Sequence, residues 1–152
     1  MDARSVFLDT NILLTAVTPF RPLYSAAVTV LNDWPANGRE LFASGQVLRE
    51  WLVVATRPIE VNGLGLSLED ALHDISAFRS RLILLEETES VATRLVELVA
   101  KYASVGKQIH DTNILATALT YEVESILTCN AADFRRYAPE IEILDLAEVL
   151  TR

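Results

Sequence analysis

The sequence predicts an α/β fold of three layers, in which helices cover both faces of a central, mostly parallel sheet of four to five strands. Short apolar segments typical of buried strands alternate with longer segments whose apolar residues recur at helical spacing. This alternation indicates parallel strands, because each must be joined to the next by a crossover that usually contains a helix. With 51% hydrophobic and 22% charged residues, the chain has the composition of a compact globule. We therefore expect residues 1–152 to form a single domain.

The predicted elements follow one another in a regular order. Residues 6–8 form the first strand, and the apolar run at 12–14 begins a helix just beyond Asp9. Further strands are expected at residues 41–43, 82–85, 125–128 and 141–144. Further helices are expected at residues 22–33, 44–56, 67–78, 88–105, 111–119, 131–136 and 145–150. Asn130 and Asp145 have the side chains that favour a helix N-cap, so they are expected to cap the last two helices.

Charge and composition restrict the possible functions. A formal net charge of −8 argues against a long, non-specific nucleic-acid track, because such a track needs a basic surface. Eight basic residues remain available for a restricted basic rim: Arg49, Arg57, Arg79, Arg81, Lys101, Lys107, Arg135 and Arg136. The apolar runs are too short to span a bilayer, and residues 1–5 lack the features of a signal peptide. The single Cys129 cannot form an internal disulfide, so we expect a cytoplasmic protein with no membrane partner.

Four carboxylates that lie far apart in the chain are expected to meet at one edge of the sheet. Asp9 directly follows the first strand, and Asp133 follows the strand at 125–128 after a short loop. Asp111 opens a helix, and Glu50 projects from another. Ligands of parallel sheets bind outside the carboxyl ends of the strands, where these loops and helix starts converge. Clustered carboxylates raise one another's pKa, so a bound cation that offsets the repulsion best explains the group.

The residue types indicate which cation. Oxygen-only ligands favour Mg²⁺ or Mn²⁺, whereas His73, His110 and Cys129 do not form a zinc-binding pattern. Each acid also has an ordinary explanation when taken alone. Asp9 suits a helix-capping turn, Asp133 suits the first turn of a helix, and Glu50 suits an exposed helix face. The presence of all four acids favours a shared acidic site.

Four segments carry a resemblance to a known family. They are Phe-Leu-Asp-Thr-Asn at 7–11, Arg-Glu-Trp at 49–51, His-Asp-Thr-Asn-Ile-Leu-Ala-Thr-Ala at 110–118 and Thr-Cys-Asn-Ala-Ala-Asp-Phe at 128–134. In this order they resemble PIN-domain nucleases, and the single-domain length is most similar to a VapC-type toxin. The resemblance covers the whole chain. Its specificity comes from four acids in the right order at about the right separations.

The resemblance implies a site and a reaction. It assigns four residues to catalysis and metal binding: Asp9, Glu50, Asp111 and Asp133. Thr10, Asn11 and Asn130 would lie beside them and support the ligands or the substrate, while Asn113 receives no role. One or two Mg²⁺ or Mn²⁺ ions would serve the cleavage of phosphodiester bonds in single-stranded or loop RNA. A bound metal would lower the pKa of the attacking water and neutralise the scissile phosphate.

The resemblance also implies partners. VapC-type toxins act beside a cognate antitoxin that covers the site, and a homodimer is expected. The predicted helices between residues 22 and 56 offer apolar and aromatic surface, including Trp34 and Trp51, on which such an antitoxin could dock. Core packing is the ordinary explanation of both tryptophans.

Two other classes of function compete with a toxin nuclease. A catalytically silent PIN-like module that serves as a binding partner or scaffold would keep the fold but fail to hold metal productively. A haloacid-dehalogenase-like phosphatase needs a second Asp two residues after its nucleophile, but position 11 is Asn. A receiver domain needs an Asp after its third strand, where residues 85–87 are Leu-Glu-Glu.

Overall fold

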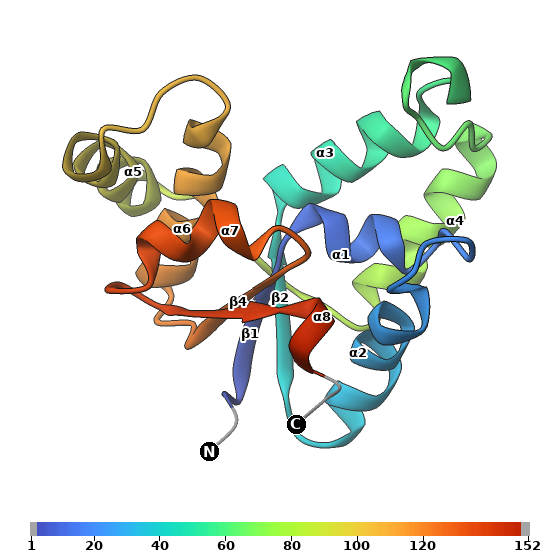
Figure 1. The fold of residues 1–152 in the computed structure, drawn as a ribbon, viewed down its shortest axis with the longest axis horizontal. Helices are drawn as coiled ribbons and strands as arrows, with labels where there is room; N and C mark the ends of the chain where they lie inside the picture. Colours follow the sequence, from blue (N-terminus) through green and yellow to red (C-terminus); the bar gives the residue numbers. More distant parts are fainter. Residues whose placement is uncertain (1–2, 150–152) are drawn as a thin grey trace.

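The computed structural model describes residues 3–149, in which five parallel strands form one sheet in the order β3-β2-β1-β4-β5 (Figure 1). The strands are β1 (Ser5–Leu8), β2 (Glu40–Ser44), β3 (Ile83–Leu85), β4 (Ser125–Thr128) and β5 (Glu142–Asp145). Helices lie on both faces of the sheet, so the predicted three-layer α/β/α fold is confirmed.

The central strands are apolar because both of their faces are covered. Phe7 of β1 is fully buried and pairs in parallel register with Phe42 of β2 on one side and Ile126 of β4 on the other. All four residues of β4 are buried, whereas β5 at the edge is only partly buried. The core therefore lies along β1 and β4, whose carboxyl ends lead directly into the predicted acids.

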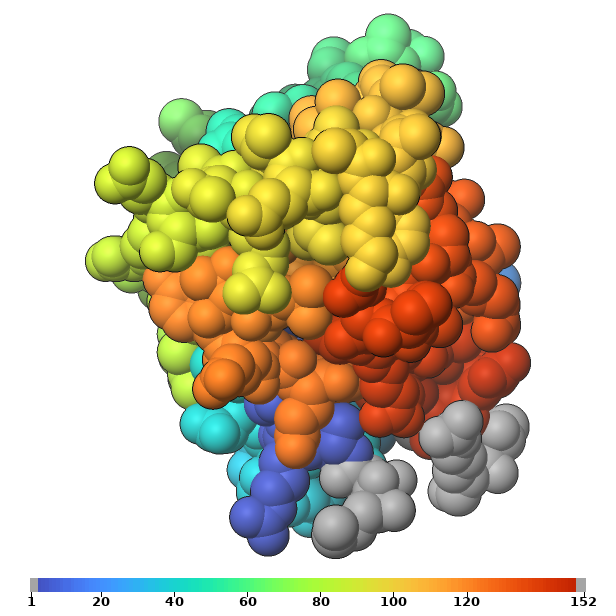
Figure 2. All heavy atoms as spheres, turned by 90° about the vertical axis from the view of Figure 1, so that its left-hand side faces the viewer, coloured from blue at the N-terminus to red at the C-terminus, as the bar shows by residue number. Residues whose placement is uncertain are grey.

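Helices fill the two outer layers. They are α1 (Thr10–Thr15), α2 (Tyr24–Ala36), α3 (Gly45–Thr56), α4 (Leu68–Arg79), α5 (Glu89–Tyr102), α6 (Gln108–Thr120), α7 (Ala131–Phe134) and α8 (Leu146–Val149). Short 3-10 turns occur at Ile59–Val61 and Arg135–Tyr137. In Figure 1, α5 and α6 lie on one side of the sheet and α1 to α4 on the other, and Figure 2 shows α5 in yellow on the outer surface. Within residues 3–149, none of these helices is long and apolar enough to cross a bilayer.

The boundary between α5 and α6 differs from the prediction. We expected α5 to continue to Gly106 and α6 to begin around Asp111. Instead, Ala103 adopts a left-handed conformation with φ 50° and ends α5. The side chain of Gln108 then accepts a hydrogen bond from the backbone of Val105, at 3.0 Å, and α6 begins at Gln108. Asp111 consequently lies inside the first turn of α6 and does not open it.

The predicted helix ends at Pro22 and Asn130 also need correction. The second helix begins at Tyr24, two residues after Pro22, and continues past Asp33 to Ala36 with Pro35 in its last turn. Asn130 occupies the N-cap position of α7 but makes no side-chain capping bond. The capping role of Asp145 is confirmed, because its carboxylate accepts a hydrogen bond from the backbone of Ala147 at 3.0 Å. The predicted end of the last helix, at residue 150, lies outside the described residues.

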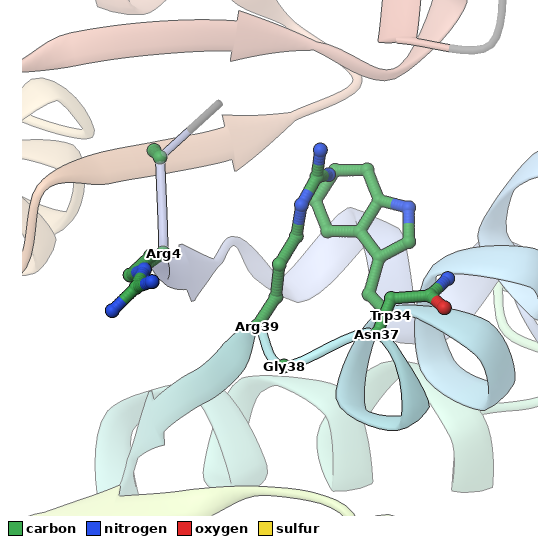
Figure 3. A pocket seen from close by; sticks show the side chains of 6 residues that line it. Arg4, Trp34, Asn37, Gly38 and Arg39 are labelled. Carbon is green, nitrogen blue, oxygen red and sulfur yellow. The ribbon is translucent and has the colours of Figure 1, made fainter. Parts of the chain in front are cut away.

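The two tryptophans belong to the core, and the prediction that they line an antitoxin-docking surface is wrong. Trp51 is fully buried and packs edge-to-face on Phe78, with ring centroids 5.2 Å apart. Trp34 is 7% exposed, and the guanidinium of Arg39 covers its ring at 4.0 Å from the centroid (Figure 3). Aliphatic residues such as Val53 and Ile59 are instead exposed in this part of the chain.

The pocket in Figure 3 lies far from the predicted acids. It measures about 680 Å³ and is lined by Ala3, Arg4, Trp34, Asn37, Gly38 and Arg39. Arg4 and Arg39 directly precede β1 and β2, so this pocket is at the amino edge of the sheet. The carboxyl edge, where ligands of parallel sheets bind, is at the opposite end of the strands.

Candidate functional site

The topology of the sheet brings distant residues together at its carboxyl edge. The chain passes from β1 to β2 on one side of β1, whereas β4 pairs with the other side. Loops and helices that leave neighbouring strands in opposite directions create a crevice at such a switch point. Asp9 follows β1 directly, and its backbone N–H donates to the carbonyl of Leu127 in β4 at 3.0 Å. The first predicted acid is thus held between the two central strands.

Asp9 is held by hydrogen bonds on both of its carboxylate oxygens. One oxygen accepts from the backbone N–H of Thr10 at 2.8 Å, and the other accepts from the hydroxyl of Thr128 at 2.8 Å. The side chain is only 7% exposed. Burial raises the pKa of Asp9 to about 6, although these hydrogen bonds favour the charged form and oppose the shift. The negative charge of Glu50 raises the pKa further.

Asn11 and Asn130 surround Thr128. The side chain of Asn11 donates to the Thr128 hydroxyl at 3.4 Å and accepts from the backbone of Cys129 at 3.0 Å. The backbone N–H of Asn130 also donates to this hydroxyl, at 3.0 Å. Because the hydroxyl oxygen accepts these bonds, its own proton is directed to Asp9. Asn11 therefore connects the start of α1 to the end of β4, and its side chain also acts to lower the pKa of Asp9.

Glu50 is also held on both of its oxygens. The hydroxyl of Thr10 donates to one at 2.8 Å, and the amide of Gln46 donates to the other at 2.9 Å. The imidazole Nδ1 of His110 lies 3.9 Å from the second oxygen, but this side chain is 70% exposed. Thr10 therefore links two predicted acids, since its backbone binds Asp9 and its hydroxyl binds Glu50.

Sequence reasoning missed the network behind Glu50. Gln46 is almost fully buried, and its amide nitrogen also donates to the backbone carbonyl of His110 at 2.9 Å. Its amide oxygen accepts from Asn113, at 2.6 Å. The same Asn113 nitrogen donates to the carboxylate of Glu87 at 2.6 Å, which in turn accepts from the backbone N–H of Gln46 at 3.2 Å. This network consists of Gln46, Asn113 and Glu87. It joins α3, α6 and the end of β3 behind the carboxylate of Glu50.

Two signals in the sequence point to this network. Gln46 precedes Glu50 by four residues, so both lie on the same face of α3. Glu87 follows the third strand by two residues, and an acid after a strand end is the same feature that singles out Asp9. No comparable signal marks Asn113, because its partners come from elements distant in sequence.

Asp111 and Asp133 lie on the open side of the site. They line a pocket of about 310 Å³ together with Lys107, Gln108, Ala132, Arg136 and Tyr137. Burial raises the pKa of Asp111 to about 7, and the charges of Asp9, Asp133 and Glu50 raise it in that order of importance. Among the described residues, no hydrogen bond reaches either side chain. The structure thus brings all four predicted acids together, close enough for their charges to interact at Asp111.

The oxygen chemistry of the site fits a small, hard cation. Within residues 3–149, no group of three or more His, Cys, Asp or Glu side chains is arranged to hold a metal ion by itself. Mg²⁺ does not need such a group, because proteins bind it through one or two carboxylates while water and phosphate oxygens complete its shell. Burial, with a smaller contribution from neighbouring acids, raises the pKa values of Asp9 and Asp111, and a divalent cation beside them would favour their charged forms.

Several solved structures share this fold. The fold matches that of VapBC2 from Rickettsia felis bound to a promoter DNA fragment, with a TM-score of 0.68 and 19% identity over 93% of this chain and 98% of that chain. DNA-bound VapBC from Salmonella typhimurium matches with a TM-score of 0.66 and 23% identity, over 93% and 98%. VapC20 from Mycobacterium tuberculosis, a sarcin-ricin loop cleaving toxin, matches with a TM-score of 0.64 and 13% identity, over 90% and 95%.

Family membership rests on a separate comparison. No curated protein sequence matches the chain as a relative. The sequence model of the PIN domain matches residues 6–139, a range that includes all four acids and both central strands. The chain therefore belongs to the PIN domain family.

Proposed function

We propose that this protein is a Mg²⁺- or Mn²⁺-dependent endoribonuclease and the toxin of a toxin–antitoxin pair. The observation that carries the proposal is the meeting of four acids at the carboxyl edge of the sheet in a PIN domain, where Thr10 links Asp9 to Glu50 and where Asp111 and Asp133 line one pocket. A PIN domain in which carboxylates gather at the carboxyl edge of the sheet has the charge distribution that a metal-dependent nuclease needs.

In this proposal the four acids form the metal site: Asp9 and Asp111 hold the metal, while Glu50 and Asp133 complete or orient its coordination shell. When bound, the metal would supply a lowered pKa for the attacking water and positive charge beside the scissile phosphate. The chain itself supplies orientation, because Thr10 fixes Glu50 through its hydroxyl and Asp9 through its backbone. Such supporting bonds commonly govern metal affinity, so Thr10, Asn11 and Asn130 act through the ligands they surround.

The fold likeness to VapBC structures supports an antitoxin partner. We propose that a cognate antitoxin covers the site, that the protein acts as a single-domain chain in a homodimer, and that it works in the cytoplasm. The aliphatic surface of α3 and the turn after it, which includes Val53 and Ile59, is available for the antitoxin in place of the buried tryptophans.

Sequencing of RNA ends after brief expression tests the nuclease directly. The protein should create new RNA ends and arrest growth, whereas Asp9→Asn should do neither although it still folds. Purified protein should cut RNA in Mg²⁺ and stop when the metal is chelated. Asp70→Asn, at an exposed position of α4, is the matched control and should behave like the wild-type protein. Cleavage by purified Asp9→Asn at the parental rate would refute the mechanism, and an absence of new ends from the parent would favour a silent binding module.

A further inference from the structure

Two basic residues line the same pocket as Asp111 and Asp133. Lys107 precedes α6, and Arg136 lies in the 3-10 turn that follows α7. Of the eight cations expected to form a basic rim, only these two line this pocket among the described residues. The pocket therefore combines two acids of the proposed metal site with two cations.

The guanidinium of Arg136 is fixed in place from behind. Its Nη2 donates to the backbone carbonyl of Tyr102 at 2.7 Å and to the hydroxyl of Ser104 at 3.0 Å. The guanidinium carbon also lies 5.0 Å from the ring centroid of Tyr137, within range of a cation–π contact. Tyr137 and Ser104 are themselves buried and each hydrogen-bonds to Thr112 at 2.7 Å. A rigid, buried framework thus holds this cation.

Arg136 keeps donors that the described part of the chain does not use. A guanidinium has five N–H donors, and the two bonds of Arg136 both involve Nη2. Among residues 3–149, no carboxylate forms an ion pair with it. A fixed guanidinium with free donors in a pocket is suited to a phosphate, which accepts two parallel N–H bonds.

We propose that Arg136, assisted by Lys107, binds a backbone phosphate of single-stranded RNA next to the bond that is cut. This inference rests on the proposed nuclease function. Carboxylates alone repel RNA, and a metal at the acids offsets their charge without holding the neighbouring nucleotide. Arg136 and Lys107 supply that second attraction. A protein with a net charge of −8 can thus bind RNA through a few local contacts and does not require a broad basic face.

Charge-removing variants with a matched control test the inference. The parent for the binding test is Asp9→Asn, which does not cleave, in Mg²⁺ with a fluorescently labelled single-stranded RNA of random sequence. Arg136→Gln should weaken binding by about tenfold and Lys107→Gln by about threefold. Each should also reduce the slope of log affinity against log salt by about 0.7, the value for one lost phosphate contact on a single strand. Arg135→Gln removes the same charge from an exposed neighbour outside the pocket and should change affinity by less than about twofold.

The outcomes separate this inference from the proposed function. Equal losses of RNA affinity in Arg135→Gln and Arg136→Gln would show that RNA is attracted by diffuse positive charge. That result would overturn the proposed phosphate contact. An unchanged salt slope in folded Arg136→Gln would also overturn it, while RNA cleavage by the wild-type protein would still support the nuclease. If Arg136→Gln fails to fold, the Lys107→Gln variant, at an exposed position, tests the inference instead. An unchanged slope of log affinity against log salt in Lys107→Gln would overturn the inference. Failure of the wild-type protein to cut any RNA, together with failure of Asp9→Asn to bind it, would overturn both proposals.

Discussion

The two halves of the acidic site differ in how their carboxylates are held. Asp9 and Glu50 each accept hydrogen bonds on both oxygens, from Thr10, Thr128 and Gln46. Asp111 and Asp133 accept none from the described residues and face a pocket. Protein donors thus fix the first half, whereas the second half remains open to ligands from solution.

The pKa values follow this difference. Asp9 is the more deeply buried acid, yet its hydrogen bonds limit the rise of its pKa to about 6. Asp111 is only half-buried and has no such bonds, and burial followed by the charges of its neighbours raises its pKa to about 7. The open half lacks protein donors, so we expect it to be the more sensitive half in the experiments below.

The largest expected effect comes from neutralising the open half. Asp111→Asn removes a proposed ligand and one of the mutually repelling charges while leaving the hydrogen bonds of Asp9 and Glu50 intact. We expect RNA cleavage to fall by more than about 100-fold, because even supporting residues of metal sites typically contribute 10- to 100-fold. At pH 8 without metal, the melting temperature should rise. A variant that cleaves normally, or melts lower than wild type, would contradict the comparison.

The held half should depend on Gln46. Gln46→Met keeps the length of the side chain but removes the amide that donates to Glu50, so we expect kcat to fall about tenfold with little change in KM. Gln46→Glu places a second carboxylate beside Glu50, and the repulsion between the two should shift the pH profile of kcat upward. Arg49→Ala, at an exposed position of the same helix, is the control for kcat. A pH profile of Gln46→Glu that matches wild type would mean that Gln46 only supports the fold.

Stability in the absence of metal should increase as the pH falls. The pKa of Asp9 is raised from 3.8 to about 6 in the folded protein, so its ionised form destabilises the fold. This destabilisation is absent below about pH 4, grows as the pH rises from about 4 to about 6, and is complete above about pH 6. A shift of roughly two pKa units corresponds to about 3 kcal/mol. Asp111 acts in the same direction up to about pH 7.

Thermal melts at several pH values measure this effect. Wild-type protein in a chelator should melt higher at pH 5 than at pH 8, and Asp9→Asn should show a smaller difference. Saturating Mg²⁺ should stabilise the protein most at pH 8, because metal ligands must be deprotonated. Equal metal-free melting temperatures at both pH values in wild type and Asp9→Asn would argue against a buried, repelling carboxylate.

The sequence predicted the acids of the site better than the network behind the held half. Asp9 and Asp133 follow strands, so the parallel-sheet rule was sufficient to place them at one edge. Gln46 also follows a strand and precedes Glu50 by four residues, but its role depends on Asn113 and on the carbonyl of His110, which approach only when the first turns of α3 and α6 meet at the carboxyl edge of the sheet. The same limit explains the error at Trp51, because a tryptophan on an amphipathic helix suits a core or a docking face equally until the packing of α4 is known.

The smallest expected effect tests whether the held half depends on a charge or on neutral hydrogen bonds. The imidazole of His110 lies 3.9 Å from Glu50 but is largely exposed, whereas its backbone carbonyl holds the amide of Gln46. His110→Ala removes the ring and keeps the carbonyl, so kcat should change by less than about twofold. A loss as large as that in Gln46→Met would instead assign the support of Glu50 to the imidazolium.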